Sequence, residues 1–136
     1  MADVTVKRVE DLEALTYEGL GMHRVRDGLG VGAFGIQVIR IPAGNDAYPE
    51  HDHSPDGVGG RMFEQRPEQL DQEEVYTVLE GSATLRVGEE DFSLEPGVFA
   101  RVGPGETRKI LTGDEDVTVL AIGGVPGRAY DPDPGL

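Results

Sequence analysis

Short hydrophobic runs recur along most of the chain, and each has the length of one β-strand. Residues typical of turns, such as glycine, proline, aspartate and glutamate, separate the runs, as in TGDED before the last of them. Short strands with turn signals at this spacing are typical of a β sandwich or barrel. We therefore predict an all-β fold with strands at 33–41, 75–80, 83–87, 98–102, 108–112 and 117–122.

Alternation within the runs predicts which side chains share a face, because successive residues of a strand point to opposite sides of the sheet. His51 and His53 are therefore expected to point the same way. Glu74 shares a face with Tyr76, and we expect this face to be turned inward. If the sheet closes on itself, one such set of side chains lines an interior.

The rest of the chain divides into an arm, an insertion and a tail around the predicted barrel at 33–124. Residues 1–32 are expected to form an N-terminal arm and the first short elements, with 8–18 as a short helix or a loose arm. The long polar segment 54–72 interrupts the barrel and is either a solvated mobile loop or a lid over the barrel mouth. Residues 125–136 are expected to form an extended tail.

Composition narrows the compartment and the class of partner. The 136 residues provide enough chain for one domain, and the formal net charge is −14. Nucleic acid and anionic membranes are not expected as partners, because like charges repel. The chain has no cysteine, no apolar signal segment and no apolar run near the ~20 residues that span a membrane. We expect a cytoplasmic protein.

A pair of histidines is the first candidate for chemistry. The stretch PEHDHS at 49–54 holds His51 and His53, two of the three histidines of the chain. Neutral imidazole is the commonest protein ligand for divalent first-row metals. The alternative is that both are exposed or hydrogen-bonded side chains at a strand end, without a metal.

The surrounding residues resemble the first motif of the cupins, a family of small β-barrel proteins. That motif joins a glycine, an H-x-H pair, a glutamate and a second glycine, which here are Gly44, His51, His53, Glu74 and Gly81. The spacing from glutamate to the second glycine matches. The gap before the histidines is one residue longer than in the family, and twenty residues replace the usual three or four after them.

A second cupin motif is matched less completely. Gly97, Pro104 and Gly105 fit its glycine and proline positions, but Arg108 stands where a histidine is expected and Thr112 where an asparagine is expected. The resemblance covers most of the chain. It implies a single cupin-type jelly-roll β-barrel, with a short N-terminal helix or arm, that assembles as a homodimer.

The resemblance also implies that His51, His53 and Glu74 hold a divalent metal ion. Two histidines and one carboxylate form the facial triad of non-haem iron sites, which leaves positions open for other ligands. Zinc, manganese, nickel and copper accept the same ligand types, so iron is one of five candidates.

Arg108 complicates this expectation, because a guanidinium is always protonated and cannot ligate a metal. At about 4 Å from a divalent ion it would be repelled by roughly 8 kcal/mol at an effective dielectric constant of 20. Three arrangements are open. Arg108 clamps a substrate carboxylate at the barrel mouth, or it pairs with Glu74 in place of the metal, or Glu64 or Gln37 completes the metal shell.

The remaining polar candidates have ordinary structural interpretations. Tyr76 is expected to pack in the core, with its hydroxyl hydrogen-bonded to some partner, and in an enzyme it could donate a hydrogen bond to the substrate. Gln37 and Arg101 are expected to point outward, and His23 is expected at the surface.

Three functions fit this sequence, and it leaves open whether the protein is an enzyme. The first is metal-dependent catalysis of oxygenase or isomerase type on a small anionic molecule, with Tyr76 and Arg108 as catalytic residues. The second is a metal-free binding module that captures a small anion with Arg108. The third is a dimeric scaffold without catalysis.

Overall fold

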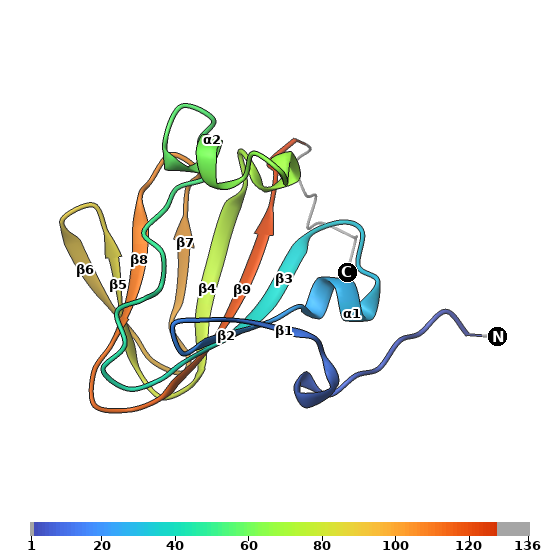
Figure 1. Cartoon of the computed structure of the whole chain (residues 1–136), viewed down its shortest axis with the longest axis horizontal. Coiled ribbons are helices and arrows are strands. Elements are labelled where there is room, and N and C mark those ends of the chain that lie inside the picture. The colour runs from blue at the N-terminus through green and yellow to red at the C-terminus, as the bar shows by residue number, and fades with distance from the viewer. Residues whose placement is uncertain (1, 128–136) are drawn as a thin grey trace, which may run out of the picture.

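A computed structural model describes residues 2–127 of the chain (Figure 1). Within them, nine strands form two antiparallel sheets, ordered β1-β2-β3-β9-β4-β7 and β6-β5-β8. The strands are β1 (Ala14–Tyr17), β2 (Leu20–His23), β3 (Gly35–Ile41), β4 (Glu73–Glu80), β5 (Ala83–Val87), β6 (Glu90–Leu94), β7 (Phe99–Val102), β8 (Arg108–Thr112) and β9 (Val117–Gly124). The helices are short: η1 (Val9–Asp11), α1 (Val25–Leu29), α2 (Val58–Met62) and η2 (Pro67–Gln69).

The predicted all-β architecture is confirmed, and each of the six predicted strands overlaps a strand of the structure. The expected helix at 8–18 is reduced to the 3₁₀ turn η1, and β1 follows it. β1 pairs with β2 through a two-residue turn at Glu18 and Gly19, whose φ angles are 48° and 90°. Positive φ at both turn residues is the geometry that matches the twist of a hairpin, so this turn favours a strand over a helix.

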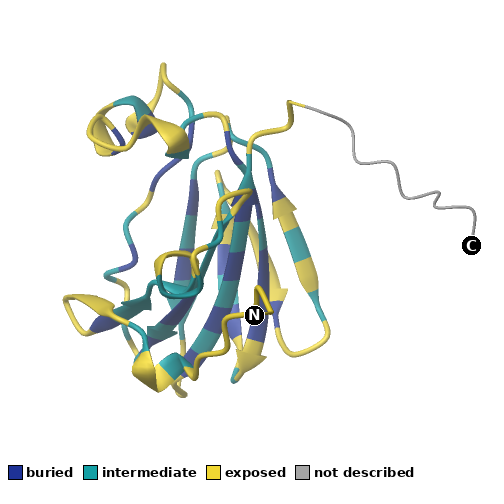
Figure 2. Cartoon of the chain, turned by 90° about the vertical axis from the view of Figure 1, so that its right-hand side faces the viewer, coloured by how far each residue is buried: buried dark blue, intermediate teal, exposed yellow. Residues whose placement is uncertain are grey.

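The hydrophobic core lies between the two sheets, where the buried faces of the strands meet (Figure 2). In β9 every second residue is buried, including Val117, Val119 and Ala121. Leu85 and Ile110 contribute the facing layer from the smaller sheet. Each such valine, leucine or isoleucine side chain, once buried, stabilises the fold by about 1.5–3 kcal/mol, so the alternating pattern accounts for how the sheets associate.

The second glycine of the first motif has a steric reason. Gly81 follows β4 with a φ of +81°, and a Cβ at this position would overlap the backbone oxygen of Asp116. Only glycine adopts this conformation without strain and leaves that space open. Gly81 therefore allows the chain to turn from β4 in the larger sheet to β5 in the smaller one.

The insertion at 54–72 contains α2 and η2 and lies over the end of the barrel where β4 begins (Figure 1). The side chain of Asp52 accepts hydrogen bonds from the backbone N–H of Ser54 (3.1 Å) and of Gly59 (2.7 Å). The backbone N–H of Asp71 donates to the carbonyl of His53 at 2.6 Å. Both ends of the insertion are thereby attached to the segment that carries the histidines.

Residues 125–127 follow β9 without regular structure, and the rest of the predicted tail, 128–136, lies outside the described residues. Among the described helices, none is long and apolar enough to cross a membrane. The division of the chain into arm, barrel and tail stays a prediction.

Candidate metal centre

The histidine segment is held against β8 by backbone hydrogen bonds. His51 and Arg108 exchange both of theirs, with N–H to carbonyl distances of 3.1 and 2.8 Å. The N–H of His53 donates to the carbonyl of Pro104 at 2.8 Å. This pairing carries the two imidazoles to the mouth of the barrel, opposite β4.

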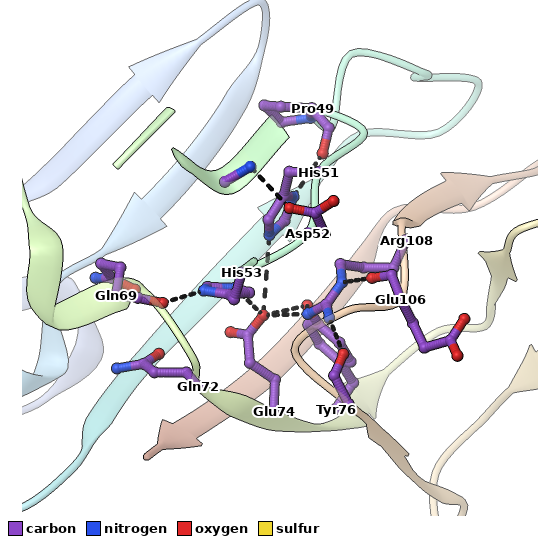
Figure 3. A network of polar contacts seen from close by, with 12 residues as sticks. Pro49, His51, Asp52, His53, Gln69, Gln72, Glu74, Tyr76, Glu106 and Arg108 are labelled. Carbon is purple, nitrogen blue, oxygen red and sulfur yellow. Dashed lines mark hydrogen bonds and ion pairs between the residues drawn. The ribbon is translucent and has the colours of Figure 1, made fainter. Parts of the chain in front are cut away.

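Glu74 and Tyr76 point inward from β4, as the alternation predicted, with 7% and 0% of their surface exposed. The Nε2 atom of His53 lies 2.7 Å from Glu74 Oε1, and that of His51 lies 3.8 Å from it (Figure 3). One ligand atom from each of the three side chains lies within 4.8 Å of the others. The predicted set of His51, His53 and Glu74 therefore converges and could hold a metal ion, although twenty residues separate His53 from Glu74 in the sequence.

The hydrogen bonds of the imidazoles fix which nitrogen faces the carboxylate. Nδ1 of His51 lies 2.8 Å from the carbonyl of Pro49, and Nδ1 of His53 lies against the carbonyl of Gln69. A carbonyl can only accept, so Nδ1 carries the proton in each ring. In a neutral ring Nε2 then presents a lone pair, which is the arrangement that metal-bound histidines adopt.

Two imidazole nitrogens and a carboxylate that converge form a set of donors suited to a cation. Nε2 of His53 and Oε1 of Glu74 lie 2.7 Å apart. A divalent ion could be held by these groups, with imidazole nitrogen and carboxylate oxygen as suitable donors. By the chemistry and direction of these donors, the site fits a first-row metal ion.

Glu74 remains ionised in this environment. Burial alone would raise the pKa of its carboxyl group, but the nearby imidazoles of His51 and His53 and the hydroxyl of Tyr76 hold that pKa well below its usual range. The guanidinium of Arg108, 2.7 Å from the same oxygen, acts in the same direction. An ionised carboxylate is what metal coordination needs.

Arg108 is fully buried and fixed by the protein. It donates to Glu74 Oε1 at 2.7 Å and to the carbonyls of Gly103 (2.6 Å) and Glu106 (3.0 Å), and more weakly to the hydroxyl of Tyr76 at 3.3 Å (Figure 3). Its guanidinium thus pairs with Glu74, which is the contact required by the second of the three arrangements considered from the sequence, while the replacement of the metal in that arrangement stays a prediction. It does not reach the barrel mouth, so the geometry does not give it the role of substrate clamp.

Two tyrosines form a buried chain of hydroxyl groups behind the carboxylate. Tyr76 donates to Glu74 Oε1 at 2.7 Å, and the hydroxyl of Tyr48 lies 3.4 Å from that of Tyr76. Burial raises the pKa of both phenols well above the usual value, so both stay neutral. Tyr76 therefore combines core packing with a hydrogen bond that orients Glu74. No periodicity in the sequence marked Tyr48.

Phe63, from the insertion, covers the histidines. Its ring stacks on that of His53 with centroids 4.7 Å apart and an angle of 14°, and it meets His51 edge-on at 5.9 Å. Gln69, from the same insertion, supplies the carbonyl that accepts from His53 Nδ1. Sequence reasoning missed both residues. The one available signal was a single aromatic side chain in a polar segment.

The candidate ligands face a cavity of about 410 Å³ beneath the insertion. This volume falls within the ~300–1,000 Å³ typical of small-molecule sites. Gln37 lines the cavity, so the expectation that it points outward is wrong. Its register partner is Ala121, which in turn pairs with Tyr76, and directly paired residues share a face of the sheet.

The other predicted positions lie outside the centre. Glu64 is exposed and does not line the cavity, so it is not placed to complete a metal shell. Arg101 is exposed, as expected, and pairs with Glu73 at 2.6 Å. His23 is half-buried on β2 and does not line the cavity.

Comparisons with known structures identify the fold. No protein-family profile matches the sequence, and no curated protein is similar to it. A cupin protein from Bacteroides fragilis is 19% identical, with a TM-score of 0.71, over 100% of this chain and 98% of the other. A sugar phosphate isomerase of the cupin superfamily from Silicibacter pomeroyi is 19% identical, with a TM-score of 0.67, over 88% and 75%.

A predicted oxalate decarboxylase from Thermotoga maritima is 16% identical, with a TM-score of 0.66, over 89% of this chain and 99% of the other. At these levels of identity the likeness concerns the fold. The protein has the cupin fold, as its motifs suggested, in the form of one small barrel domain.

Proposed function

We propose that this protein binds one divalent metal ion through His51, His53 and Glu74 and acts on a small anionic molecule in the adjoining cavity. The observation that carries the proposal is the direction of the imidazoles. Both Nδ1 atoms face backbone carbonyls, so both Nε2 atoms are turned towards one ionised carboxylate. Three donors arranged in this way leave further coordination positions for a substrate.

The residues around the ligands prepare the site for chemistry. Tyr76 and Arg108 hold Glu74 in position, and Phe63 shields one face of His53 from water. Gln37 adds a polar group to the cavity wall. When bound, the metal would supply Lewis acidity or activate oxygen. We propose catalysis of isomerase or oxygenase type.

Two of the similar structures bear on the class of substrate. One is named as a sugar phosphate isomerase and another as a predicted oxalate decarboxylase, and both names refer to small anions. A cavity of about 410 Å³ that is lined by the three candidate metal ligands suits molecules of that size and charge.

Measurement of metal content tests the proposal. Protein prepared without a histidine tag is expected to bind about one equivalent of a first-row metal by elemental analysis and calorimetry. His51→Ala and His53→Ala should each lose most of this binding. His23→Ala is the matched control, because it removes the third histidine outside the site and should bind like the wild type. Equal, sub-stoichiometric metal in all four proteins would rule the proposal out.

A metal-free binding module is the second candidate, with the anion bound by cavity residues other than Arg108, and the ion pair between Arg108 and Glu74 favours the metal-free state. In that state the guanidinium partners the carboxylate where the metal would otherwise do so. This candidate predicts that small carboxylates raise the melting temperature equally with and without a chelator. Stabilisation that requires metal would instead support the first proposal.

A further inference from the structure

The anionic ligand proposed above needs a cationic partner in the cavity, and Arg108 is not available for this role. Its side chain is fully buried, and its nitrogens donate to Glu74, Gly103 and Glu106. It is not among the residues that line the cavity. Any ligand carboxylate or phosphate must therefore be recognised by other side chains.

Two arginines line the cavity of the candidate ligands: Arg24, between β2 and α1, and Arg66, in the insertion. A smaller adjoining cavity of about 110 Å³ is lined by the same two arginines, and with Arg26, Asp27, Glu68 and Glu74 its positive and negative side chains are equal in number. Of the residues that line the larger cavity, Glu74 is the one carboxylate. The whole chain has 26 acidic residues against 12 lysines and arginines, so the excess of positive charge in the larger cavity is local.

Arg66 is held beside the metal centre by its neighbours. Its Cζ atom lies 5.8 Å from the centroid of the Phe63 ring, within the range of a cation–π contact. The same ring stacks on His53. The backbone N–H of Arg66 donates to the carbonyl of Phe63 at 2.9 Å, and its own carbonyl accepts from Gln69 at 3.0 Å. These contacts fix the base of the side chain at the edge of the cavity.

The guanidinium of Arg66 is free to bind a ligand. Within residues 2–127 it forms no ion pair with a carboxylate. Arg24 pairs with Asp27 at 3.4 Å, with the two side chains 34% and 54% exposed. Exposed pairs of this kind contribute ~0–1 kcal/mol, so a ligand oxyanion can replace Asp27 at little cost.

We infer that Arg66, assisted by Arg24, binds the acidic group of the ligand and so determines substrate specificity. The inference rests on the proposed function. The ligand class is a small molecule that presents one group to the metal and a carboxylate or phosphate to the arginines, because a guanidinium binds either oxyanion in bidentate geometry. The insertion then acts in both parts of the site, through Phe63 and Gln69 on His53 and through Arg66 on the ligand.

Binding of simple oxyanions to three forms of the protein tests this assignment. Wild type, Arg66→Gln and Arg61→Gln are titrated by calorimetry with phosphate, oxalate, succinate and glycerol phosphate, both loaded with zinc and treated with EDTA. Arg61 is the matched control, because it is an exposed arginine of the same insertion that lines neither cavity.

At least one anion is expected to bind wild type and Arg61→Gln alike and to bind Arg66→Gln about 10- to 100-fold more weakly, the loss typical of a charge-assisted hydrogen bond. Equal affinities for Arg66→Gln and Arg61→Gln, or no binding to wild type by any of the four anions, would overturn the inference. Zinc titration of the same proteins separates the two proposals. If wild type takes up no zinc, the metal proposal fails, while the EDTA arm still tests Arg66.

Discussion

Replacing Arg108 with methionine tests how this cation shapes the centre. The substitution keeps much of the side-chain volume but removes the charge that pairs with Glu74 at 2.7 Å. With charge centres about 4 Å apart, the pair is worth roughly 4 kcal/mol at an effective dielectric constant of 20. Breaking a buried pair by removing one partner costs about 3–5 kcal/mol, because the other charge is left uncompensated. We therefore expect a loss of ~3–5 kcal/mol in the free energy of unfolding of the metal-free protein.

Metal binding should change in the opposite direction. The methionine variant no longer places a positive charge next to the ion, and the carboxylate of Glu74 no longer pairs with a guanidinium that competes with the metal. We expect zinc to bind Arg108→Met at least about tenfold more tightly than wild type, a gain of ~1.4 kcal/mol or more. Saturating zinc should then recover part of the lost stability, because a ligand that binds the folded state stabilises it.

Urea unfolding in EDTA and in excess zinc, together with zinc calorimetry, measures both effects. Arg101→Met is the matched control, because Arg101 pairs with Glu73 at 2.6 Å but its side chain is 63% exposed. Exposed pairs contribute little, so this variant should unfold within about 0.5 kcal/mol of wild type. The reasoning is refuted if both variants lose the same stability, or if Arg108→Met binds zinc no more tightly than wild type.

Three further substitutions test the fold and the site. In urea unfolding, Gly81→Ala should lower the free energy of unfolding by at least about 2 kcal/mol, and Gly88→Ala by only about 1 kcal/mol. Both glycines have positive φ, but only a Cβ at position 81 would meet a backbone oxygen, so equal losses would contradict the steric argument. Burial raises the pKa of Tyr48, so its contribution to the free energy of unfolding is complete below pH ~10 and declines above it by up to ~1.4 kcal/mol per pH unit. Tyr48→Phe should therefore lose less free energy of unfolding than wild type from pH 10 to 11, and an unchanged slope would oppose this. Phe63→Leu should bind zinc about tenfold more weakly, because the ring that orients one histidine is lost, whereas Val58→Ala on the exposed side of α2 should bind like wild type.

Local patterns predicted the barrel and the inward face of β4. Strand alternation placed Glu74 and Tyr76 on one face, and the structure buries both. The same rule would have placed Gln37 inward with its neighbour Ile39, which is fully buried. The error came from treating a polar residue as outward. Polar side chains that line a cavity break the expected pattern in this way.

The contacts of the insertion and of Arg108 could not be predicted from the sequence. Spacing alone could not reveal that Phe63 packs on His53, because contacts between a loop and a barrel depend on how the chain folds back. The pairing of Arg108 with Glu74 was one of three open arrangements, and the nearby carbonyls of Gly103 and Glu106 favour it by satisfying the guanidinium. The homodimer and the cytoplasmic location stay predictions.

The charges of the site connect the metal, Arg108 and the ligand. A divalent ion bound beside one carboxylate and one fixed guanidinium leaves the centre with a net charge of about +2, where a third neutral histidine would leave about +1. An anion in the cavity reduces this excess, so it should strengthen metal binding, and by thermodynamic reciprocity the metal should strengthen anion binding by the same factor. Arg108 thereby weakens metal binding when no anion is present and makes metal binding depend more on an anionic ligand. Arg66 lines the cavity in which that ligand would bind.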